Sequence, residues 1–404
     1  MGEMDDQAHT FPARLGINKV NGMASLSLSG PSLLVEELPL PNANDWGAVE
    51  GLATMTSAYL SIVRESCASL TLSTKERDLA LETLRAMGTK LMGRILGKYR
   101  AGWHKGLGPG TLRYGPNFPP LMDVEISCND QIVLPAEILP LADPIGSEPQ
   151  AELRNAAALL GFGAACHRAT TATRAEADEA LLDPQAVRFY WHVGLRGAKE
   201  QWKWLCKRFE ALGPHPEKDE DSRALAELIV LKRRGPEPLA VAVEHFHCHH
   251  ERSNIPGTQE DVMRLKAARW RWYSATPETR ISADELVTLG RPAVAGLVFL
   301  NACSSQFVSP RAVSSFAREL LLNGRNAVVT TWADVPDDVA FTIACFFYEA
   351  LLRGDTVGAS LREARIRLLL EKNNPLGLLF TVYGDSRFRL AGGTERARQG
   401  RVKR

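Results

Sequence analysis

Two apolar runs, each ending in reactive side chains, constrain the fold of this chain more than any other feature. They are Val241–His250 (VAVEHFHCHH) and Ala295–Ser305 (AGLVFLNACSS). Apolar runs of this length are typical of strands that are buried on both faces of a parallel sheet. At the carboxyl ends of such strands the chain leaves the sheet and exposes side chains to a crevice. His249 and Cys303 are therefore predicted to lie side by side at one edge of the sheet.

These two side chains are the combination that nucleophilic catalysis by a thiol requires. A cysteine thiol becomes a useful nucleophile near neutral pH when a base takes its proton, and imidazole is the usual base. We expect Cys303 to attack a carbonyl carbon and His249 to accept and return the proton. Strand alternation places His245 and His247 on the face of His249, where they can orient it, and turns Cys248 to the opposite face as a packing residue.

The residues around both side chains resemble a known family. HFHCHH is similar to HFACHG of the CHAT peptidases, a prokaryotic branch of the caspase-like, separase-related cysteine proteases of clan CD, and LNACSS is similar to their LSACES. His249 precedes Cys303 by 54 positions, close to the roughly 50 positions found in caspases. Further similar segments are Met122–Leu139, Leu322–Tyr348 and Leu351–Leu368.

The resemblance implies both a fold and an activity. We expect an α/β fold with a caspase-like, mostly parallel sheet flanked by helices, and a smaller, mainly helical N-terminal region. The implied activity is that of a cysteine endopeptidase, a regulated prokaryotic defence or conflict effector that cleaves a partner protein encoded nearby. CHAT domains often follow tetratricopeptide arrays, but this chain shows no repeat near that period. A separate sensor or regulator protein is therefore expected to supply the signal.

The resemblance also assigns residues around the dyad. The oxyanion would be held by the backbone N–H groups of Cys303 and His250, the latter standing where the family usually has glycine. Trp332–Asp337 (WADVPD) resembles the family's LWDVTD loop, in which an acidic residue selects arginine before the cleaved bond. Asp334 and Asp337 are thus the expected substrate-binding residues, since a carboxylate can hold arginine bidentately. The alternative for both is the N-terminus of the following helix, where Asp is favoured.

Composition and pattern divide the chain into three parts. Residues 1–119 are predicted to form a helical or α+β region that ends in a stretch rich in Gly and Pro. Residues 120–390 alternate strand and helix patterns, which favours a mostly parallel sheet, and form the predicted peptidase domain. Residues 391–404 are a basic tail, predicted to be disordered and solvated.

Apolar spacing and capping signals predict individual elements. Ser73 and Glu76 form a capping box for a helix that runs to about Tyr99. Other helices are predicted at Trp46–Glu65, Ala198–Leu212, Ala224–Leu231, Ile281–Leu289, Ala340–Leu352 and Thr356–Leu370. Strands are predicted at Ala24–Ser29, Phe189–Gly194, Ala327–Thr331 and Leu376–Tyr383, and Glu260–Tyr273 is expected to be helical or irregular.

The overall composition excludes some functions and favours a compartment. The net charge of +1 argues against a broad surface for nucleic acid or membrane. No apolar run approaches the ~20 residues that cross a bilayer. Seven scattered cysteines without a CxxC pair suit a reducing cytosol, so a cytoplasmic protein is predicted, and no cofactor or metal is expected.

Two alternatives from other classes stay open. The HxHxHH cluster resembles the HxHxDH zinc motif of metallo-β-lactamases, with His249 in place of the Asp, and imidazoles at alternate strand positions can converge on zinc. A zinc-dependent hydrolase of that kind also needs histidines far downstream, and none follows His250. The other alternative is a catalytically inactive caspase-like scaffold or binding module, which would lose no function on Cys303→Ala.

Overall fold

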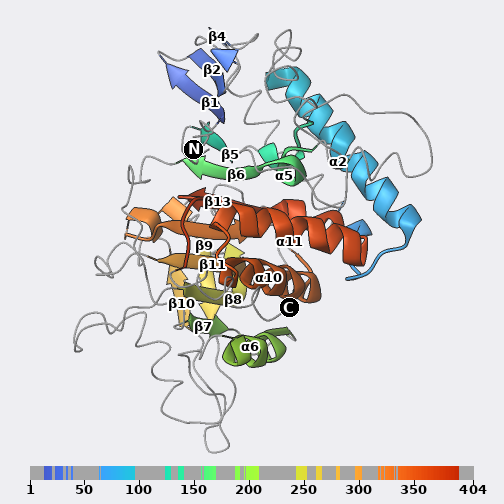
Figure 1. Ribbon diagram of the computed structural model, residues 1–404, viewed down its shortest axis with the longest axis vertical. Helices are drawn as coiled ribbons and strands as arrows, with labels where there is room; N and C mark the ends of the chain where they lie inside the picture. Colours follow the sequence, from blue (N-terminus) through green and yellow to red (C-terminus); the bar gives the residue numbers. More distant parts are fainter. Residues whose placement is uncertain are drawn as a thin grey trace, which may run out of the picture.

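A β-sheet with helices packed on it makes up the described part of the computed structural model (Figure 1). The structure describes residues 13–20, 23–30, 33–34, 38–39, 63, 65–95, 123–128, 135–140, 156, 159–169, 187–191, 195, 197–208, 243–252, 261–265, 279–282, 296–302, 317–318, 320–322, 324–331, 333 and 335–390.

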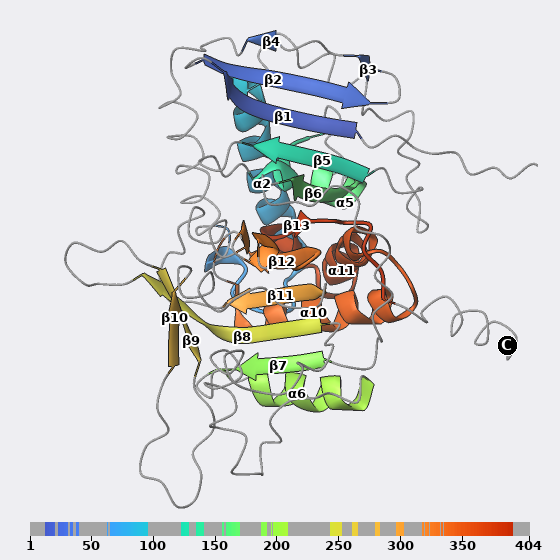
Figure 2. The ribbon, with the colours of Figure 1, turned by 90° about the vertical axis from the view of Figure 1, so that its left-hand side faces the viewer.

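The strands follow the order β10-β9-β8-β11-β12-β13-β6-β5-β1-β2-β3, with β7 paired to β8 and β4 to β2 (Figure 2). Their bounds are β1 Ala13–Val20, β2 Met23–Gly30, β3 Leu33–Leu34, β4 Leu38–Pro39, β5 Asp123–Cys128, β6 Ala165–Ala169, β7 Val187–Trp191, β8 Val243–Arg252, β9 Asp261–Leu265, β10 Thr279–Ser282, β11 Leu297–Ala302, β12 Ala327–Thr331 and β13 Phe380–Gly384.

Most neighbours in the middle of this sheet are parallel. From β7 across to β1, each described pair runs parallel except β12 with β13. Parallel strands need crossover connections, and the connection from β7 to β8 contains helix α6 (Gly197–Arg208). The predicted fold class, an α/β protein with a mostly parallel sheet flanked by helices, is therefore confirmed.

Three helices lie side by side along the sheet: α6 (Gly197–Arg208), α10 (Asp337–Leu352) and α11 (Val357–Lys372) (Figure 1). The Phe299 ring of β11 packs against Phe347 and Tyr348 of α10, with ring centroids 5.2 and 5.6 Å apart. Trp202 and Leu205 of α6 are buried. This aromatic layer fixes α10 against the strands that carry the predicted dyad.

The described part of the N-terminal region combines strands with a helix. The hairpin of β1 and β2 extends the main sheet, because β1 pairs with β5. Helix α2 (Thr74–Ile95) begins at the predicted capping box, in which the Ser73 N–H donates to Glu76 (2.7 Å) and the Glu76 N–H donates to Ser73 Oγ (3.3 Å). The boundary at residue 119 stays a prediction.

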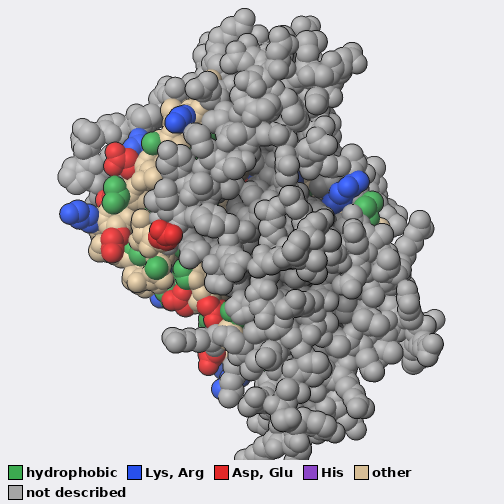
Figure 3. Space-filling model, turned by 180° about the vertical axis from the view of Figure 1, so that it is seen from behind, with side chains coloured by type: hydrophobic (Ala, Val, Ile, Leu, Met, Phe, Trp, Pro, Cys, Tyr) green, Lys and Arg blue, Asp and Glu red, His purple; other side chains and the backbone are tan. Residues whose placement is uncertain are grey.

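Short elements link these layers. They are the helix α5 (Leu160–Gly163) and the 3-10 turns η2 (Ala136–Ile138) and η4 (Pro375–Leu379). In the part of the chain that the structure describes, no helix is both long and apolar enough to cross a membrane. In the part of the surface that Figure 3 colours, acidic and basic side chains lie close to one another.

The segment after β8 corrects two predictions. The helix predicted at Ile281–Leu289 is wrong at its start, where Ile281 and Ser282 belong to β10, and the described part of Glu260–Tyr273 is the strand β9. Strand β8 continues past the predicted end at His250 to Arg252 and pairs antiparallel with β9. An unpaired strand extension offers backbone hydrogen bonds, and such tertiary pairing overrides local helix signals.

The last strand begins later than predicted. Pro375 opens η4, so the first half of the predicted strand Leu376–Tyr383 is a 3-10 turn, and β13 starts at Phe380. The turn begins where the Asn374 side chain accepts the N–H of Leu376 (3.0 Å) and Pro fixes φ at the first helical position. The predicted helices Trp46–Glu65 and Ala224–Leu231 lie largely or wholly outside the described residues.

The N-cap of α11 gives a first testable prediction. Thr356 caps this helix by accepting the N–H of Ala359 at Oγ1 (3.2 Å). Thr356→Val keeps the shape and removes the acceptor, so it should lower the free energy of unfolding by about 1 kcal/mol. Urea unfolding measures the change. Thr342→Val on exposed α10 surface is the control, and equal effects of both changes would contradict the capping role.

Candidate active site

The carboxyl ends of β7, β8, β11 and β12 lie at one edge of the sheet, because each runs parallel to its neighbour. Strands β8 and β11 are in register there: Asn301 lies opposite His247, and Ala302 lies opposite Cys248. In the sequence, His249 comes directly after Cys248, and Cys303 comes directly after Ala302. The register therefore brings the two predicted strand ends to the same level.

The buried face of β8 carries two histidines above α10. His245 is fully buried, shares a hydrogen bond of 2.7 Å between its Nδ1 and the Tyr348 hydroxyl, and stacks on Phe299 with ring centroids 4.9 Å apart. Burial, with a smaller contribution from neighbouring His247, holds the pKa of His245 well below its ordinary value. His245 is thus a neutral packing residue that ties β8 to α10.

His247 is also fully buried, but its surroundings are polar. Its Nδ1 contacts Gln201 Oε1 of α6, and its Nε2 lies 2.5 Å from Oδ1 of Asp337, the first residue of α10. An ionised carboxylate can only accept, so Nε2 carries a proton and donates it to Asp337. Whether Nδ1 donates or accepts depends on the orientation of the Gln201 amide. His247 thus links three elements: β8, α6 and α10.

Asp337 also binds the start of α6. The N–H of Gly197 donates to Asp337 Oδ2 at 2.5 Å. A methyl group at position 197 would lie 3.1 Å from Oδ1 of Asp337, so the missing side chain of Gly197 lets the helix approach the carboxylate closely. The carboxylate lies at the N-termini of both α6 and α10, where negative charge is favourable.

The structure describes some of the predicted site residues and leaves others outside. His249 and His250 lie in β8, paired through the backbone with Arg264 and Met263 of β9. Cys303 and Asp334 lie outside the described residues. Asp337 is brought together with His247 and Gly197, so at Asp337 the structure places a carboxylate turned toward protein partners at a helix start.

Strand β8 also carries a thiol, that of Cys248. Cys248 is fully buried, and burial raises the pKa of its thiol to about 12. A thiol with such a pKa stays protonated near neutral pH and is a poor nucleophile. Cys248 is therefore a packing residue, in agreement with the prediction from strand alternation.

The described residues include the side chains of two histidines of the HxHxHH pattern, His245 and His247. They contain no group of three or more His, Cys, Asp or Glu side chains placed to hold a metal ion. Both ring nitrogens of His247 already contact protein groups, so this side chain has no lone pair turned to a metal. His245 and His247 of the HxHxHH pattern contact residues of α6 and α10.

Sequence reasoning missed two residues of this site. Gln201 and Tyr348 sit inside amphipathic helices, where nothing distinguishes them from other polar or aromatic positions. They contact histidines 46 and 103 positions away. No local spacing signal can find such pairs, because they depend on how the helices dock.

Comparison with known proteins finds a family match. Residues 217–389 match the CHAT domain family model, a span that contains β8 to β13 and both helices α10 and α11. The resemblance drawn from the two motifs is confirmed over these residues. A curated protein from Vitiosangium sp. (strain GDMCC 1.1324), named a probable protease, is 35% identical over 106 residues. That match covers 25% of this chain and 13% of the relative.

Two crystal structures of the Saccharomyces cerevisiae separase–securin complex, at 3.0 and 2.6 Å resolution, are also similar. Their TM-scores are 0.47 and 0.46, at 9% and 11% sequence identity, over 92% of this chain. This chain covers 30% of the separase-complex chain in each case.

Proposed function

We propose that this chain is a cysteine endopeptidase in which Cys303 is the nucleophile and His249 the general base. The observation that carries the proposal is the register of β8 and β11, in which Ala302 lies opposite Cys248. In the sequence, Cys303 directly follows Ala302, and His249 directly follows Cys248. Of the four histidines in HFHCHH, only His249 holds that position, because His247 lies opposite Asn301.

The chemistry follows from this pairing. His249 takes the thiol proton, and Cys303 Sγ attacks the peptide carbonyl carbon to form a tetrahedral oxyanion. His249 then protonates the departing amine, and the acyl group stays bound to Cys303. Water hydrolyses this acyl-enzyme in the second step. We propose the backbone N–H groups of His250 and Cys303 as the oxyanion donors. The match to the CHAT family and the name of the Vitiosangium relative support peptide hydrolysis.

Substrate choice and biological role extend the proposal. In the sequence, Asp334 follows the end of β12 by three residues and precedes the start of α10 by three. We assign it the recognition of arginine before the cleaved bond. A defence role, a partner substrate encoded nearby and a separate sensor are parts of the same proposal. A cytoplasmic location fits the free thiols of the described cysteines.

Peptidyl chloromethyl ketones with Arg, Asp or Leu at the reacting position test this proposal. We expect covalent attachment at Cys303, mapped by mass spectrometry, and fastest with Arg. Cys345 is the internal control. Burial, and to a smaller extent the charge of nearby Glu349, raises the pKa of its thiol well above the ordinary value, so this thiol should be a poor nucleophile. Attachment to both cysteines at equal rates, or none at Cys303 with any reagent, would reject the dyad and favour the inactive scaffold.

The same reagents test the role of Asp334. Asp334→Asn should slow the arginine reagent by about 10-fold or more while leaving the leucine reagent unchanged, since a bidentate charged contact is lost only for arginine. Reaction rates at several reagent concentrations measure the effect. An equal loss for both reagents, or wild-type preference for leucine, would contradict the assignment.

A further inference from the structure

A partly buried contact joins the segment that follows β12 to strand β8. Asp337 begins α10, directly after the loop that follows β12, and its Oδ1 lies 2.5 Å from Nε2 of His247. His247 lies two residues before His249 in β8. The imidazole of His247 is fully buried and the Asp337 side chain is 23% exposed, so solvent screens this contact only weakly.

Two residues of α6 also contact the His247–Asp337 pair. Gln201 of α6 contacts Nδ1 of His247, and the N–H of Gly197 donates to Asp337 Oδ2 (2.5 Å). The pair therefore also fixes the start of α6, which follows the carboxyl end of β7. Hydrogen bonds to charged groups are about twice as strong as neutral ones, and groups locked on several sides have little freedom to reorient.

We infer that Asp337 and His247 form a positioning pair that holds the β12–α10 loop and the histidine strand in one fixed relation at the catalytic edge. This inference rests on the proposed function and deepens it: Asp337 is a positioning residue, and arginine recognition is left to Asp334. Both carboxylate oxygens of Asp337 are engaged by protein donors. A substrate guanidinium would have to displace a buried imidazole to gain the same oxygens, at the cost of leaving that imidazole without its acceptor.

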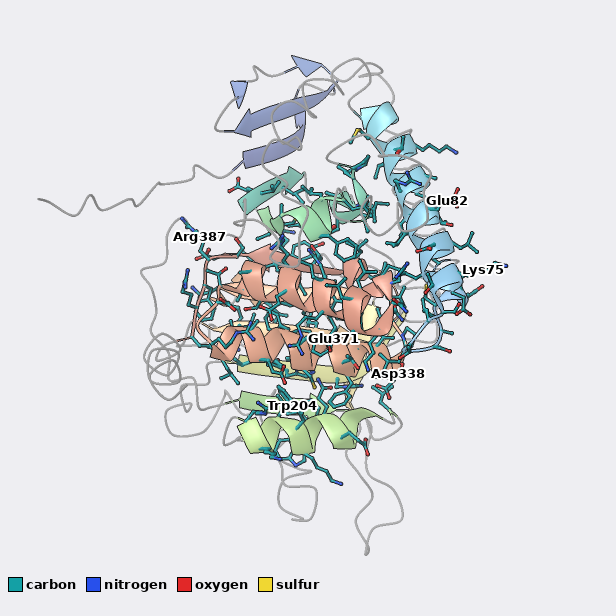
Figure 4. The ribbon with its side chains drawn as sticks, turned by 45° about the vertical axis from the view of Figure 1, so that its right-hand side comes forward. Lys75, Glu82, Trp204, Asp338, Glu371 and Arg387 are labelled. Carbon is teal, nitrogen blue, oxygen red and sulfur yellow. The ribbon has the colours of Figure 1, made fainter. Side chains whose placement is uncertain are left out.

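Asp337→Asn tests the inference, because it keeps the shape of the side chain and removes the charge. The readout is inactivation by the Arg and Leu chloromethyl ketones, separated into the limiting rate and the reagent concentration at half that rate. A positioning role predicts a limiting rate about 10-fold lower for both reagents at unchanged half-saturation, since small misplacements of catalytic groups slow chemistry. Asp338→Asn is the matched control, at the same end of α10 but exposed (Figure 4).

The remaining outcomes each decide the matter. If Asp337→Asn weakens half-saturation for the Arg reagent alone, Asp337 binds substrate and the inference is overturned. If Asp337→Asn reacts like wild type, or if Asp338→Asn loses as much, the pair does not position the site. If wild-type Cys303 reacts with no reagent, the proposed function fails first. Thermal unfolding of both variants, compared with wild type, distinguishes a loss of positioning from a loss of fold.

Discussion

Replacing Cys303 or His249 by alanine should abolish peptide hydrolysis while leaving the fold intact. Loss of either member of a nucleophile–base pair costs about 10³-fold or more in kcat, and removing both costs little beyond removing one. The measurement is hydrolysis of a fluorogenic peptide that carries the residue preferred in the chloromethyl ketone panel. Thermal unfolding should be unchanged within about 2 °C, which separates a loss of chemistry from a loss of fold.

The control for this pair is Cys345→Ala. Cys345 lies within helix α10, not in β8 or β11. Burial raises the pKa of its thiol. It should hydrolyse the peptide at the wild-type rate. Activity retained in Cys303→Ala, or lost equally in Cys345→Ala, would show that another group performs the chemistry.

Glu137→Ala should cause the largest loss of stability. Glu137 is fully buried and accepts from Arg168 Nη2 (2.8 Å) and from Thr381 Oγ1 (2.5 Å). Its Oε1 also lies 3.8 Å from the guanidinium of fully buried Arg365, whose pKa is lowered by burial and raised in part by Glu137. Removing the carboxylate takes away the negative charge that faces the buried guanidinium groups of Arg168 and Arg365. The free energy of unfolding should fall by about 3–5 kcal/mol.

Urea unfolding measures this loss, and two variants bracket it. Glu137→Gln keeps the shape and one acceptor oxygen, so its loss should be smaller than that of Glu137→Ala. Glu371→Ala removes an exposed carboxylate of α11 that pairs with Arg367 at 2.9 Å (Figure 4), and should change stability by less than about 0.5 kcal/mol. Similar losses in Glu137→Ala and Glu371→Ala would contradict the part assigned to the buried network.

Sequence patterns were sufficient for the central elements. The apolar runs around His249 and Cys303 predicted two neighbouring parallel strands, and β8 and β11 are such a pair. Helices α10 and α11 begin within three residues of their predicted starts, because caps and apolar spacing act locally. The capping box at Ser73 is likewise a local feature and is confirmed.

The parts that sequence reasoning missed depend on tertiary contacts. Strands β9 and β10 are short, and their pairing is tertiary: the extension of β8 pairs with β9, and β9 pairs in turn with β10. The pairing of His247 with Asp337 joins residues 90 positions apart, so no local spacing could predict it. Nothing in the spacing of WADVPD distinguishes a carboxylate that turns inward from one that turns to a ligand.

The pH dependence of Cys303 alkylation by iodoacetamide, followed by mass spectrometry, tests the central claim most directly. A thiol that shares its proton with a neighbouring imidazole should react with an apparent pKa at least about one unit below the ~8.5 of free cysteine. The account predicts this lowered pKa in the wild-type protein and its return to the ordinary value in His249→Ala. Identical profiles in both proteins, with an apparent pKa at or above the ordinary value, would contradict it.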